Sequence, residues 1–364
     1  MSKAAYSCGP AGPETLTDLG WDQELDAAFS RYSGPYIAGR VACQHRTVFD
    51  VLIPQGSVRV GVSGALRRLE KVPAVGDFVV LLDQPETGSR MIVDILPRRS
   101  MLSRGAAGEG SAEQAIAANV DTVFIVTAAG ADFNLRRLER YLAVVHASGA
   151  RPVIVINKSD MADDPAAIAA EAAEVAGAVP VVTVSAREGS GIAALDPFLG
   201  AGTTVVLVGS SGVGKSTLIN ALLHEVVQET ADVRTRDEKG RHTTTVRQLF
   251  RLPGGALVID NPGIREIQLG NATPGIEETF TDITTLAAGC RYPDCRHETE
   301  PGCAVRAAVE AGRLSEKRLD SFLRLSKELE FQTEKNEIGL KRIEKKKYKW
   351  IGKAAKEFRK DKRY

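Results

Sequence analysis

One short stretch of the chain combines the residue types that bind phosphate. It reads Gly209-Ser210-Ser211-Gly212-Val213-Gly214-Lys215-Ser216 and lies between an apolar run, Thr204 to Val208, and a stretch with helical spacing, Thr217 to Leu223. Glycines let the backbone curl so that successive N–H groups point toward one anion, and the helix start adds its positive dipole end. Lys215 then serves as a binding and catalytic cation near the terminal phosphates, and the Ser216 hydroxyl binds Mg²⁺. We predict a nucleotide phosphate-binding loop that continues into Thr217; the alternative is an ordinary strand-to-helix turn.

Two polar motifs at predicted strand ends have the chemistry to recognise guanine. Asn157-Lys158-Ser159-Asp160 follows the apolar run Val153 to Ile156, and Ser185-Ala186 follows the next predicted strand. The Asp160 carboxylate can accept hydrogen bonds from both the N1–H and the exocyclic amine of guanine, a pattern that adenine cannot satisfy. The Ala186 backbone N–H can donate to the guanine O6. Either motif alone is also typical of a solvated loop, so the prediction of a GTP site depends on their joint occurrence.

Two further motifs, downstream of the phosphate-binding loop, fit a nucleotide-sensing role. Asp260 begins an Asp-Asn-Pro-Gly sequence after the apolar run Ala256 to Ile259, so it is placed to reach Mg²⁺ through water while the Gly263 N–H meets a γ-phosphate. Thr244 lies in a run of three threonines whose hydroxyls can complete the Mg²⁺ shell. That run can equally be a threonine-rich lead-in to a strand at Val246 to Leu252.

The residue that would orient the attacking water is not obvious from the motifs. In many GTPases a glutamine directly follows the D-x-x-G glycine, whereas this chain has Ile264 there. Another group must then complete the site, which predicts slow hydrolysis by the protein alone and faster hydrolysis with a partner. His242, next to the threonine run, is the best local candidate; the alternative is a surface histidine without a role.

Four metal-ligating side chains lie within a short segment closer to the C-terminus. They are Cys290, Cys295, His297 and Cys303, and prolines and a glycine interrupt the segment. Three thiolates and one imidazole match a closed tetrahedral Zn²⁺ site, which leaves no position for a reactive water and therefore predicts a structural role. Buried free cysteines or a redox pair are the competing interpretations.

The elements that position these motifs follow from hydrophobic periodicity. From Tyr36 to about Leu96, five short β-like segments fit a closed barrel of the oligonucleotide/oligosaccharide-binding (OB) type, or else a generic small β domain. After a Gly-, Ser- and Arg-rich connector at Pro97 to Ala115, strands alternate with helices, of which the clearest are Leu135 to Ala147 and Pro165 to Ala176. This alternation predicts a parallel sheet that is covered on both faces, with ligands at the carboxyl ends of its strands.

Composition limits the class of protein. The chain has 364 residues, of which 43% are hydrophobic and 26% charged, as is typical of a soluble globular protein with two or three domains. It has no long apolar run and no secretory signal, which predicts a cytoplasmic protein that does not span a membrane. The net charge of +1 gives no global argument for nucleic acid, but Lys341 to Tyr364 is dominated by Lys and Arg. That tail is either a solvated helix or a segment that contacts RNA phosphates and stacks on bases.

The order of the motifs is informative. In ordinary GTPases the phosphate-binding loop comes first, whereas here Asn157 to Asp160 and Ser185-Ala186 precede Gly209 to Ser216. The sequence therefore resembles the circularly permuted GTPases. With a barrel-like domain before these motifs and a Cys/His cluster after them, it is similar to the ribosome small-subunit-dependent GTPase A family over roughly residues 35 to 325. One departure is Asn261, where the family commonly has a small hydroxyl residue.

The resemblance implies a domain organisation and a function. The expected domains are a mostly flexible N-terminal arm (1–34), an OB-type barrel (35–98), a circularly permuted α/β P-loop GTPase domain (99–268), an α-rich zinc domain (269–330) and a basic tail (331–364). Within the arm, the sequence indicates one short helix at Asp22 to Phe29. The resemblance further implies a monomeric GTPase with Mg²⁺ at the nucleotide, one structural Zn²⁺ and a catalytic role for His242. Such a protein binds the small ribosomal subunit and its rRNA in late maturation and leaves after hydrolysis. Two other classes remain open: a P-loop ATPase, and a zinc and barrel RNA-binding module with a regulatory nucleotide site.

Overall fold

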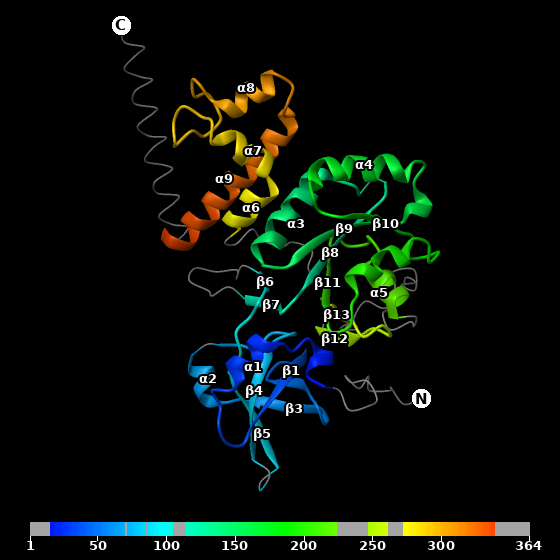
Figure 1. The fold of residues 1–364 in the computed structure, drawn as a ribbon, viewed down its shortest axis with the longest axis vertical. Helices are drawn as coiled ribbons and strands as arrows, with labels where there is room; N and C mark the ends of the chain where they lie inside the picture. Colours follow the sequence, from blue (N-terminus) through cyan, green and yellow to red (C-terminus); the bar gives the residue numbers. More distant parts are fainter. Residues whose placement is uncertain are drawn as a thin grey trace, which may run out of the picture.

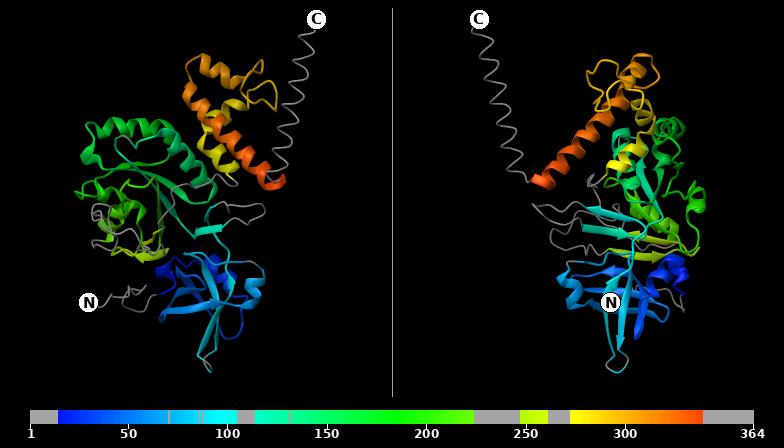
Figure 2. Two further views of the ribbon diagram at one scale, coloured as in Figure 1. Left: turned by 180° about the vertical axis from the view of Figure 1, so that it is seen from behind. Right: turned by 60° about the vertical axis from the view of Figure 1, so that its left-hand side comes forward.

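The chain folds into three bodies, with a β-barrel at one end of the long axis and an α-helical domain at the other (Figure 1). The computed structural model describes residues 15–69, 71–84, 86, 88–104, 114–130, 132–223, 247–260 and 272–338. The further views in Figure 2 also show the sheet-and-helix body between the other two.

The N-terminal body is a closed five-stranded barrel. Its elements are β1 (Tyr36–Gln44), β2 (Val48–Ile53), β3 (Gly56–Val62), α2 (Gly64–Arg68), β4 (Phe78–Gln84) and β5 (Ser89–Ile95). Antiparallel pairing joins β1 to β2, β2 to β3, β4 to β5 and β1 to β4, and parallel pairing of β3 with β5 closes the ring. The core includes Val51, Leu81 and Ile92, because alternate residues of each strand point inward. The predicted OB-type barrel is therefore confirmed.

Residues 15–34 differ from the predicted flexible arm. They contain the 3₁₀ helix η1 (Thr17–Leu19) and the helix α1 (Gln23–Phe29). Leu19 and Leu25 are buried, and the Trp21 ring meets the Phe78 ring edge-on at 5.3 Å. The short helix indicated at Asp22 to Phe29 is present as α1 with Asp22 as its N-cap. The prediction that the rest of this part is flexible is wrong, because a few apolar side chains dock on the barrel without forming a long periodic pattern. Residues 1–14 lie outside the described residues.

The middle body is built on a sheet with strand order β10-β9-β8-β11-β13-β12. Its elements are β8 (Thr122–Ala128), α3 (Leu135–Ala147), β9 (Arg151–Asn157), η2 (Ser159–Met161), α4 (Pro165–Ala176), β10 (Val181–Thr183), η3 (Ile192–Phe198), β11 (Thr204–Val208), α5 (Lys215–Leu223), β12 (Gln248–Arg251) and β13 (Leu257–Asp260). Neighbouring strands from β10 to β13 are parallel, as predicted. The edge strand β12 is antiparallel to β13, which the sequence analysis did not predict; the two are joined by a tight turn that only antiparallel strands can use.

Helices cover both faces of this sheet. Leu138 of α3 and Ala172 of α4 belong to the core on one face. Leu218 of α5 and Leu195 of η3 belong to the core on the other face. The bounds of α3 and α4 equal those predicted from periodicity, because each has a polar N-cap (Asn134 or Asp164) directly before its apolar pattern. The doubly covered α/β fold is therefore confirmed.

The predicted connector at Pro97 to Ala115 contains regular structure. The strands β6 (Met101–Arg104) and β7 (Gln114–Ala118) form an antiparallel pair of their own. The Gly- and Ser-rich composition of the residues between these strands concealed the pairing in the sequence. This hairpin lies next to the barrel and the middle body in Figure 1.

The C-terminal body is helical. Its elements are α6 (Thr273–Thr279), α7 (Thr281–Ala287), α8 (Ala304–Glu310) and α9 (Glu316–Ile338). Gly275 of α6 packs tightly on α3, since a Cβ at this position would lie 1.8 Å from the Ala143 carbonyl oxygen. Helix α9 continues past the predicted domain end at residue 330, and the tail from residue 339 lies outside the described residues. Among the described residues, no helix has both the length and the apolar character needed to cross a membrane.

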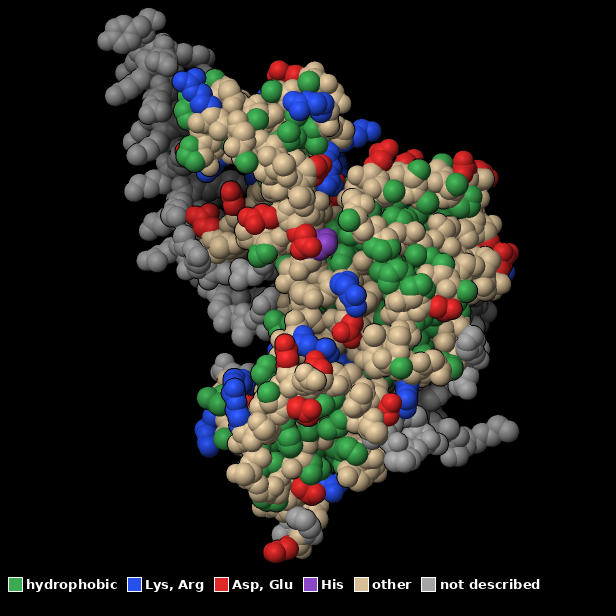
Figure 3. Space-filling model, in the orientation of Figure 1, with side chains coloured by type: hydrophobic (Ala, Val, Ile, Leu, Met, Phe, Trp, Pro, Cys, Tyr) green, Lys and Arg blue, Asp and Glu red, His purple; other side chains and the backbone are tan. Residues whose placement is uncertain are grey.

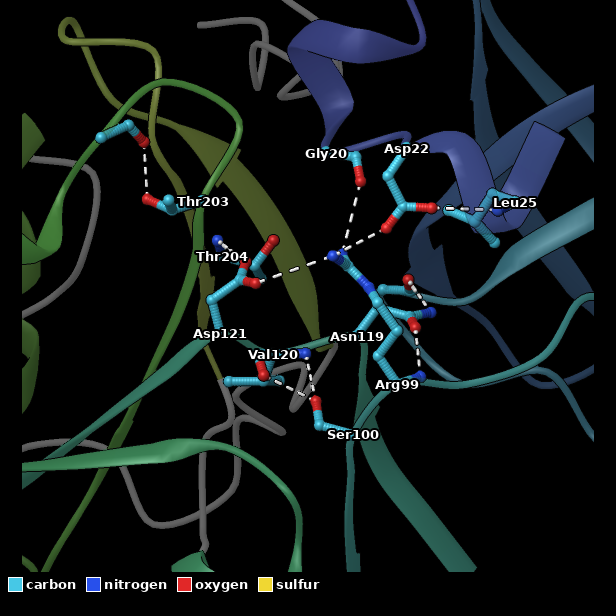
Figure 4. A network of polar contacts seen from close by, with 12 residues as sticks. Gly20, Asp22, Leu25, Arg99, Ser100, Asn119, Val120, Asp121, Thr203 and Thr204 are labelled. Atoms are coloured by element: carbon cyan, nitrogen blue, oxygen red, sulfur yellow. Dashed lines mark hydrogen bonds and ion pairs between the residues drawn. The ribbon is translucent and has the colours of Figure 1, made fainter.

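The barrel and the middle body are joined by polar contacts and by one strand pairing. β1 of the barrel pairs with β12 at Cys43 and Gln248, so the two sheets are continuous. Figure 4 shows that the Arg99 guanidinium lies between the N-terminal segment and the middle body, where it pairs with Asp22 at 3.0 Å and with Asp121 at 4.0 Å. The Asp121 carboxylate also accepts a 2.7 Å hydrogen bond from the Thr204 N–H at the start of β11. The strand that precedes the phosphate-binding loop is thus fixed at its beginning.

Candidate nucleotide site and metal centre

The predicted phosphate-binding loop lies between β11 and α5, at the carboxyl end of an interior parallel strand. Lys215 is the first residue of α5, and its Nζ donates hydrogen bonds to the carbonyl oxygens of Gly209 (2.8 Å) and Ser210 (2.6 Å). These bonds hold the ammonium group over the loop, near the start of the helix. Gly209 has φ 144°, and a Cβ there would lie 2.1 Å from the Val126 carbonyl oxygen, so glycine is required.

Asn157 connects three of the predicted motifs. Its Nδ2 donates to the carbonyl oxygen of Val213 in the phosphate-binding loop at 2.9 Å, and its Oδ1 accepts from the Ala186 N–H at 3.0 Å. The side chain is buried, with 1% exposure. Gly214 keeps this contact possible, because a Cβ there would lie 2.3 Å from the Asn157 Nδ2. The structure therefore brings together three segments that are far apart in the sequence.

The residues predicted to recognise guanine stand at the same edge of the sheet. Asp160 is exposed, and its Oδ1 accepts a 2.6 Å hydrogen bond from the Ser185 hydroxyl, which orients the carboxylate. Lys158 has a left-handed backbone (φ 62°), and the aliphatic part of its side chain approaches Gly214 of the phosphate-binding loop. Ser159 donates its N–H to the Val184 carbonyl oxygen at 3.2 Å. The exposed Asp160 carboxylate, next to the aliphatic side chain of Lys158 and the phosphate-binding loop, could accept hydrogen bonds from a nucleoside base.

The remaining predicted nucleotide and magnesium residues are only partly described. Ser216 and Thr217 lie half-buried in the first turn of α5, and Asp260 ends β13, which pairs with β11. Gly263, Thr244, His242, Asn261 and Ile264 lie outside the described residues. The bridging role of Asn157 and the orienting role of Ser185 were not foreseen, because neither contact leaves a local signal in the sequence.

The four predicted metal ligands converge in the C-terminal body. The His297 Nδ1 lies 3.6 Å from the Cys290 Sγ, 3.4 Å from the Cys295 Sγ and 3.4 Å from the Cys303 Sγ, and the sulfurs of Cys290 and Cys303 are 3.9 Å apart. All four ligand atoms lie within 4.8 Å of one another. Burial lowers the pKa of His297, which favours the neutral imidazole that binds metals. These residues could hold one metal ion.

Local structure explains why these ligands point toward one another. Cys290 follows the last turn of α7, and Cys303 is the N-cap of α8, where its sulfur accepts from the Arg306 N–H at 3.4 Å. His297 adopts a left-handed backbone (φ 62°), which turns its ring inward against Phe322 of α9. The site therefore joins α7, α8 and α9, the elements that make up most of this body.

A second cluster in the described residues is already occupied by protein groups. Cys43, His45 and Asp50 of the barrel lie close enough to hold a metal. Arg59, however, donates to both oxygens of Asp50, at 2.6 and 3.0 Å, and His45 pairs with the same carboxylate at 2.8 Å. We therefore assign no metal to this cluster.

The fold and the site define a class of protein. The motif predicted to recognise the base precedes the predicted phosphate-binding loop in the chain and contacts it in space, which is the arrangement of a circularly permuted GTPase. The structure described as YloQ, a circularly permuted GTPase, has this fold: the TM-score is 0.57 at 24% identity over 82% of this chain and 96% of that chain. The structure of YjeQ from Thermotoga maritima gives a TM-score of 0.61 at 29% identity over 81% of this chain and 98% of that chain.

The chain belongs to the RsgA GTPase family. The family model described as RsgA GTPase matches residues 95–270. The chain is 60% identical over 341 residues to the small ribosomal subunit biogenesis GTPase RsgA of Methanosarcina acetivorans, which covers 94% of this chain and 92% of that protein. It is 46% identical over 351 residues to the protein of the same name from Opitutus terrae, over 93% of this chain and 96% of that protein.

Proposed function

We propose that this chain is a cytoplasmic, monomeric GTPase that binds the small ribosomal subunit in late maturation and leaves it after GTP hydrolysis. The observation that carries the proposal is the position of the Asn157 side chain, which donates a hydrogen bond to the Val213 carbonyl oxygen and accepts one from the Ala186 N–H. These bonds would join the residues proposed to recognise guanine to those proposed to bind phosphate. Relatives that are 60% and 46% identical over most of the chain are named small ribosomal subunit biogenesis GTPases. Both observations favour a GTPase over a P-loop ATPase.

The proposed roles at the nucleotide follow from residue type and position. Asp160 and the Ala186 N–H recognise guanine, while the loop from Gly209 to Ser216, with Lys215, holds the phosphates. Bound Mg²⁺ would neutralise charge on the β- and γ-phosphates, with Ser216 and Thr244 as its protein ligands and Asp260 reaching it through water. The position after Gly263 carries no glutamine, so another residue must orient the attacking water. We assign this role to His242. Replacement of His242 by alanine should abolish the stimulation of hydrolysis by the small subunit.

We assign the Cys290, Cys295, His297 and Cys303 cluster to one structural Zn²⁺. With Zn–S near 2.3 Å and Zn–N near 2.0 Å, a regular tetrahedron has S–S edges of about 3.8 Å and S–N edges of about 3.5 Å. The S–S separation of 3.9 Å and the S–N separations of 3.4 to 3.6 Å agree with these lengths. All four positions are filled by protein, so the ion would stabilise the fold and activate no water.

We propose that the C-terminal body responds to the nucleotide. Helix α6 follows Asp260 by about a dozen residues and packs on α3 of the GTPase domain, where His146 pairs with Glu278 at 3.1 Å. A loop that senses the γ-phosphate at Asp260 to Gly263 would therefore pull directly on α6. We also propose that the five segments given in the sequence analysis are the domains of the protein, except that residues 15–34 pack on the barrel and do not form an arm.

Sedimentation with isolated small subunits tests this proposal. The full chain should sediment with small subunits in the presence of a non-hydrolysable GTP analogue and remain in the supernatant with GDP. Large subunits serve as the matched control and should not retain it. Equal retention with GTP analogue and GDP would contradict the proposed cycle, and retention that requires an ATP analogue instead would favour the ATPase alternative.

A further inference from the structure

A cavity of about 250 Å³ lies between the GTPase domain and the C-terminal body. It is lined by Arg136, Arg137 and Arg140 of α3 and by Ser321, Arg324 and Leu325 of α9. We call the four arginines together the arginine cleft. Figure 3 shows Lys and Arg side chains beside Asp and Glu side chains where the C-terminal body meets the GTPase domain. The arginine cleft is separate from the nucleotide residues and from the four metal ligands.

Three of these arginines occupy an unfavourable position for a cation. They lie in the first two turns of α3, where the helix dipole repels positive charge, and the first turn contains no acidic residue. Helix starts usually carry Asp or Glu instead. The positive charge at this point therefore does not stabilise α3 through its dipole, and it favours a negatively charged partner.

The carboxylates around the arginine cleft do not balance its charge. Arg136 and Arg324 share one carboxylate, that of Asp320, at 2.8 and 3.0 Å. Arg140 pairs with Glu328 at 2.7 and 2.9 Å, and Arg137 pairs with Asp132 at 2.9 Å. Within the described part of the chain, the ion pairs of these four guanidinium groups involve three carboxylates.

These pairs can exchange partners readily. The side chains of Arg136 and Arg324 are 52% and 65% exposed, and that of Asp320 is 40% exposed. Solvent-exposed ion pairs contribute little to stability, so an incoming anion can replace the carboxylate at small cost. The buried Ser321 and Leu325 form a fixed floor beneath the exposed guanidinium groups.

We propose that the arginine cleft binds phosphate groups of an RNA backbone, and this inference rests on the proposed binding of the small ribosomal subunit. A phosphate presents more acceptor oxygens than a carboxylate and can bond several guanidinium forks at once. The convergence of four arginines therefore suits a phosphodiester better than an acidic side chain. In the sequence, the stretch after α9 from Lys341 to Tyr364 is also rich in Lys and Arg.

RNA in the arginine cleft would couple to the nucleotide state. One wall is α3 of the GTPase domain, and the other is α9 of the C-terminal body, so a phosphate bound by both walls holds the two bodies together. Because α6 also packs on α3, a nucleotide-dependent shift of α6 changes the distance between these walls. By reciprocal linkage, RNA that favours the closed arrangement also favours the nucleotide that produces it.

Two opposite pairs of substitutions test the inference. Binding of the full chain to isolated small subunits, with GTP analogue, is measured as a function of salt concentration. The Arg136→Gln/Arg324→Gln variant should bind about tenfold more weakly, and the slope of log K against log salt should decrease by about 1 to 2. The Asp320→Asn/Glu328→Gln variant releases the guanidinium groups of Arg136, Arg324 and Arg140 from their carboxylates and should bind more tightly. Lys317→Gln, exposed on α9 outside the arginine cleft, is the matched control and should change the affinity less.

The outcomes separate this inference from the proposed function. Wild-type affinity and slope in the arginine variant would overturn the inference, as would equal weakening by both pairs of substitutions, because the ion pairs would then be structural. Stronger competition by polyglutamate than by rRNA would assign the arginine cleft to an acidic protein and would also overturn it. Failure of the wild-type chain to bind small subunits would contradict the proposed function itself. Thermal unfolding of each variant establishes that it is folded.

Discussion

The Asn157 side chain donates a hydrogen bond to the Val213 carbonyl oxygen at 2.9 Å, across 56 residues of chain. The same amide accepts the Ala186 N–H at 3.0 Å, and the side chain is buried. Asn157 thus fixes the spacing between the loops that are proposed to hold the guanine base and the phosphates. The predicted phosphate-binding loop comes later in the chain than Asn157. The contact therefore brings together two motifs that are far apart in the permuted sequence.

Replacement of Asn157 by alanine should damage nucleotide binding more than overall folding. The change leaves the buried Val213 carbonyl and Ala186 N–H unpaired, at a cost of about 1–3 kcal/mol each. We expect the affinity for GTP, measured by titration calorimetry, to fall at least about tenfold. Asn134→Ala, which removes the α3 N-cap at a cost of about 1 kcal/mol, is the control and should lower the unfolding temperature with little change in GTP affinity. Wild-type GTP affinity in Asn157→Ala would contradict the bridging role.

Replacement of Asp160 by asparagine should change the preferred base. The carboxylate accepts from the two donors of guanine, whereas an amide can donate to the carbonyl that xanthine carries in place of the exocyclic amine. GTP binding should fall by two to three orders of magnitude, roughly the loss of a charged hydrogen-bond pair, and xanthosine triphosphate binding should rise. Competition between the two triphosphates measures the switch, with the exposed neighbour Asp163→Asn as control. An unaltered preference for GTP would show that Asp160 does not read the base.

Glu300 should stabilise the metal-binding segment in a pH-dependent manner. Its carboxylate accepts the N–H groups of Arg296, Glu298 and Thr299 at 2.9 to 3.0 Å, and these bonds lower its pKa from 4.5 to about 2. A carboxylate with a lowered pKa stabilises the fold fully above the unfolded value of 4.5, and this contribution is lost as the pH falls toward 2. The unfolding temperature of Glu300→Gln should therefore lie below that of the wild type at neutral pH, and the difference should shrink in acid.

The control for Glu300 is the exposed Glu310→Gln on α8. It should match the wild type across the same pH range. A difference between the wild type and Glu300→Gln that stays constant from neutral pH to pH 3 would show that the carboxylate charge is not responsible.

Replacement of Gly275 by alanine should loosen the C-terminal body from the GTPase domain. The added Cβ would lie 1.8 Å from the Ala143 carbonyl oxygen, so α6 must move away from α3. Overpacking of this kind costs about 1–3 kcal/mol. We expect a lower free energy of unfolding in urea, together with weaker stimulation of GTP hydrolysis by small subunits. Gly254→Ala, where a Cβ meets no atom within 4 Å, should leave both quantities unchanged; equal behaviour of the two variants would exclude a role for this helix contact.

Local patterns predicted much of the fold. The helices Leu135–Ala147 and Pro165–Ala176 were predicted with the bounds that the structure has, because spacing, polar N-caps and a first-turn proline all act within a few residues. The clustering of Cys290, Cys295, His297 and Cys303 was also predicted, since the segment that carries them is short and rich in Cys and His. In both cases the information lies within the segment itself.

What the sequence analysis missed depends on contacts between distant segments. Burial of Leu19 and Leu25 requires the barrel surface on which they pack. The pairing of β12 with β1 at Cys43 and Gln248, and the bond from Asn157 to Val213, join residues whose proximity exists only after folding. No periodicity or motif records such partners, so neither the docking of the N-terminal segment on the barrel nor the junction of the two sheets was predicted.

The rate of GTP hydrolysis with and without small ribosomal subunits tests the central claim most directly. The full chain, loaded with Mg²⁺ and Zn²⁺, should hydrolyse GTP slowly alone and many-fold faster with isolated small subunits, and ATP should not replace GTP. Preferential hydrolysis of ATP, or GTP hydrolysis at one rate whether or not small subunits are present, would contradict a small-subunit-dependent GTPase.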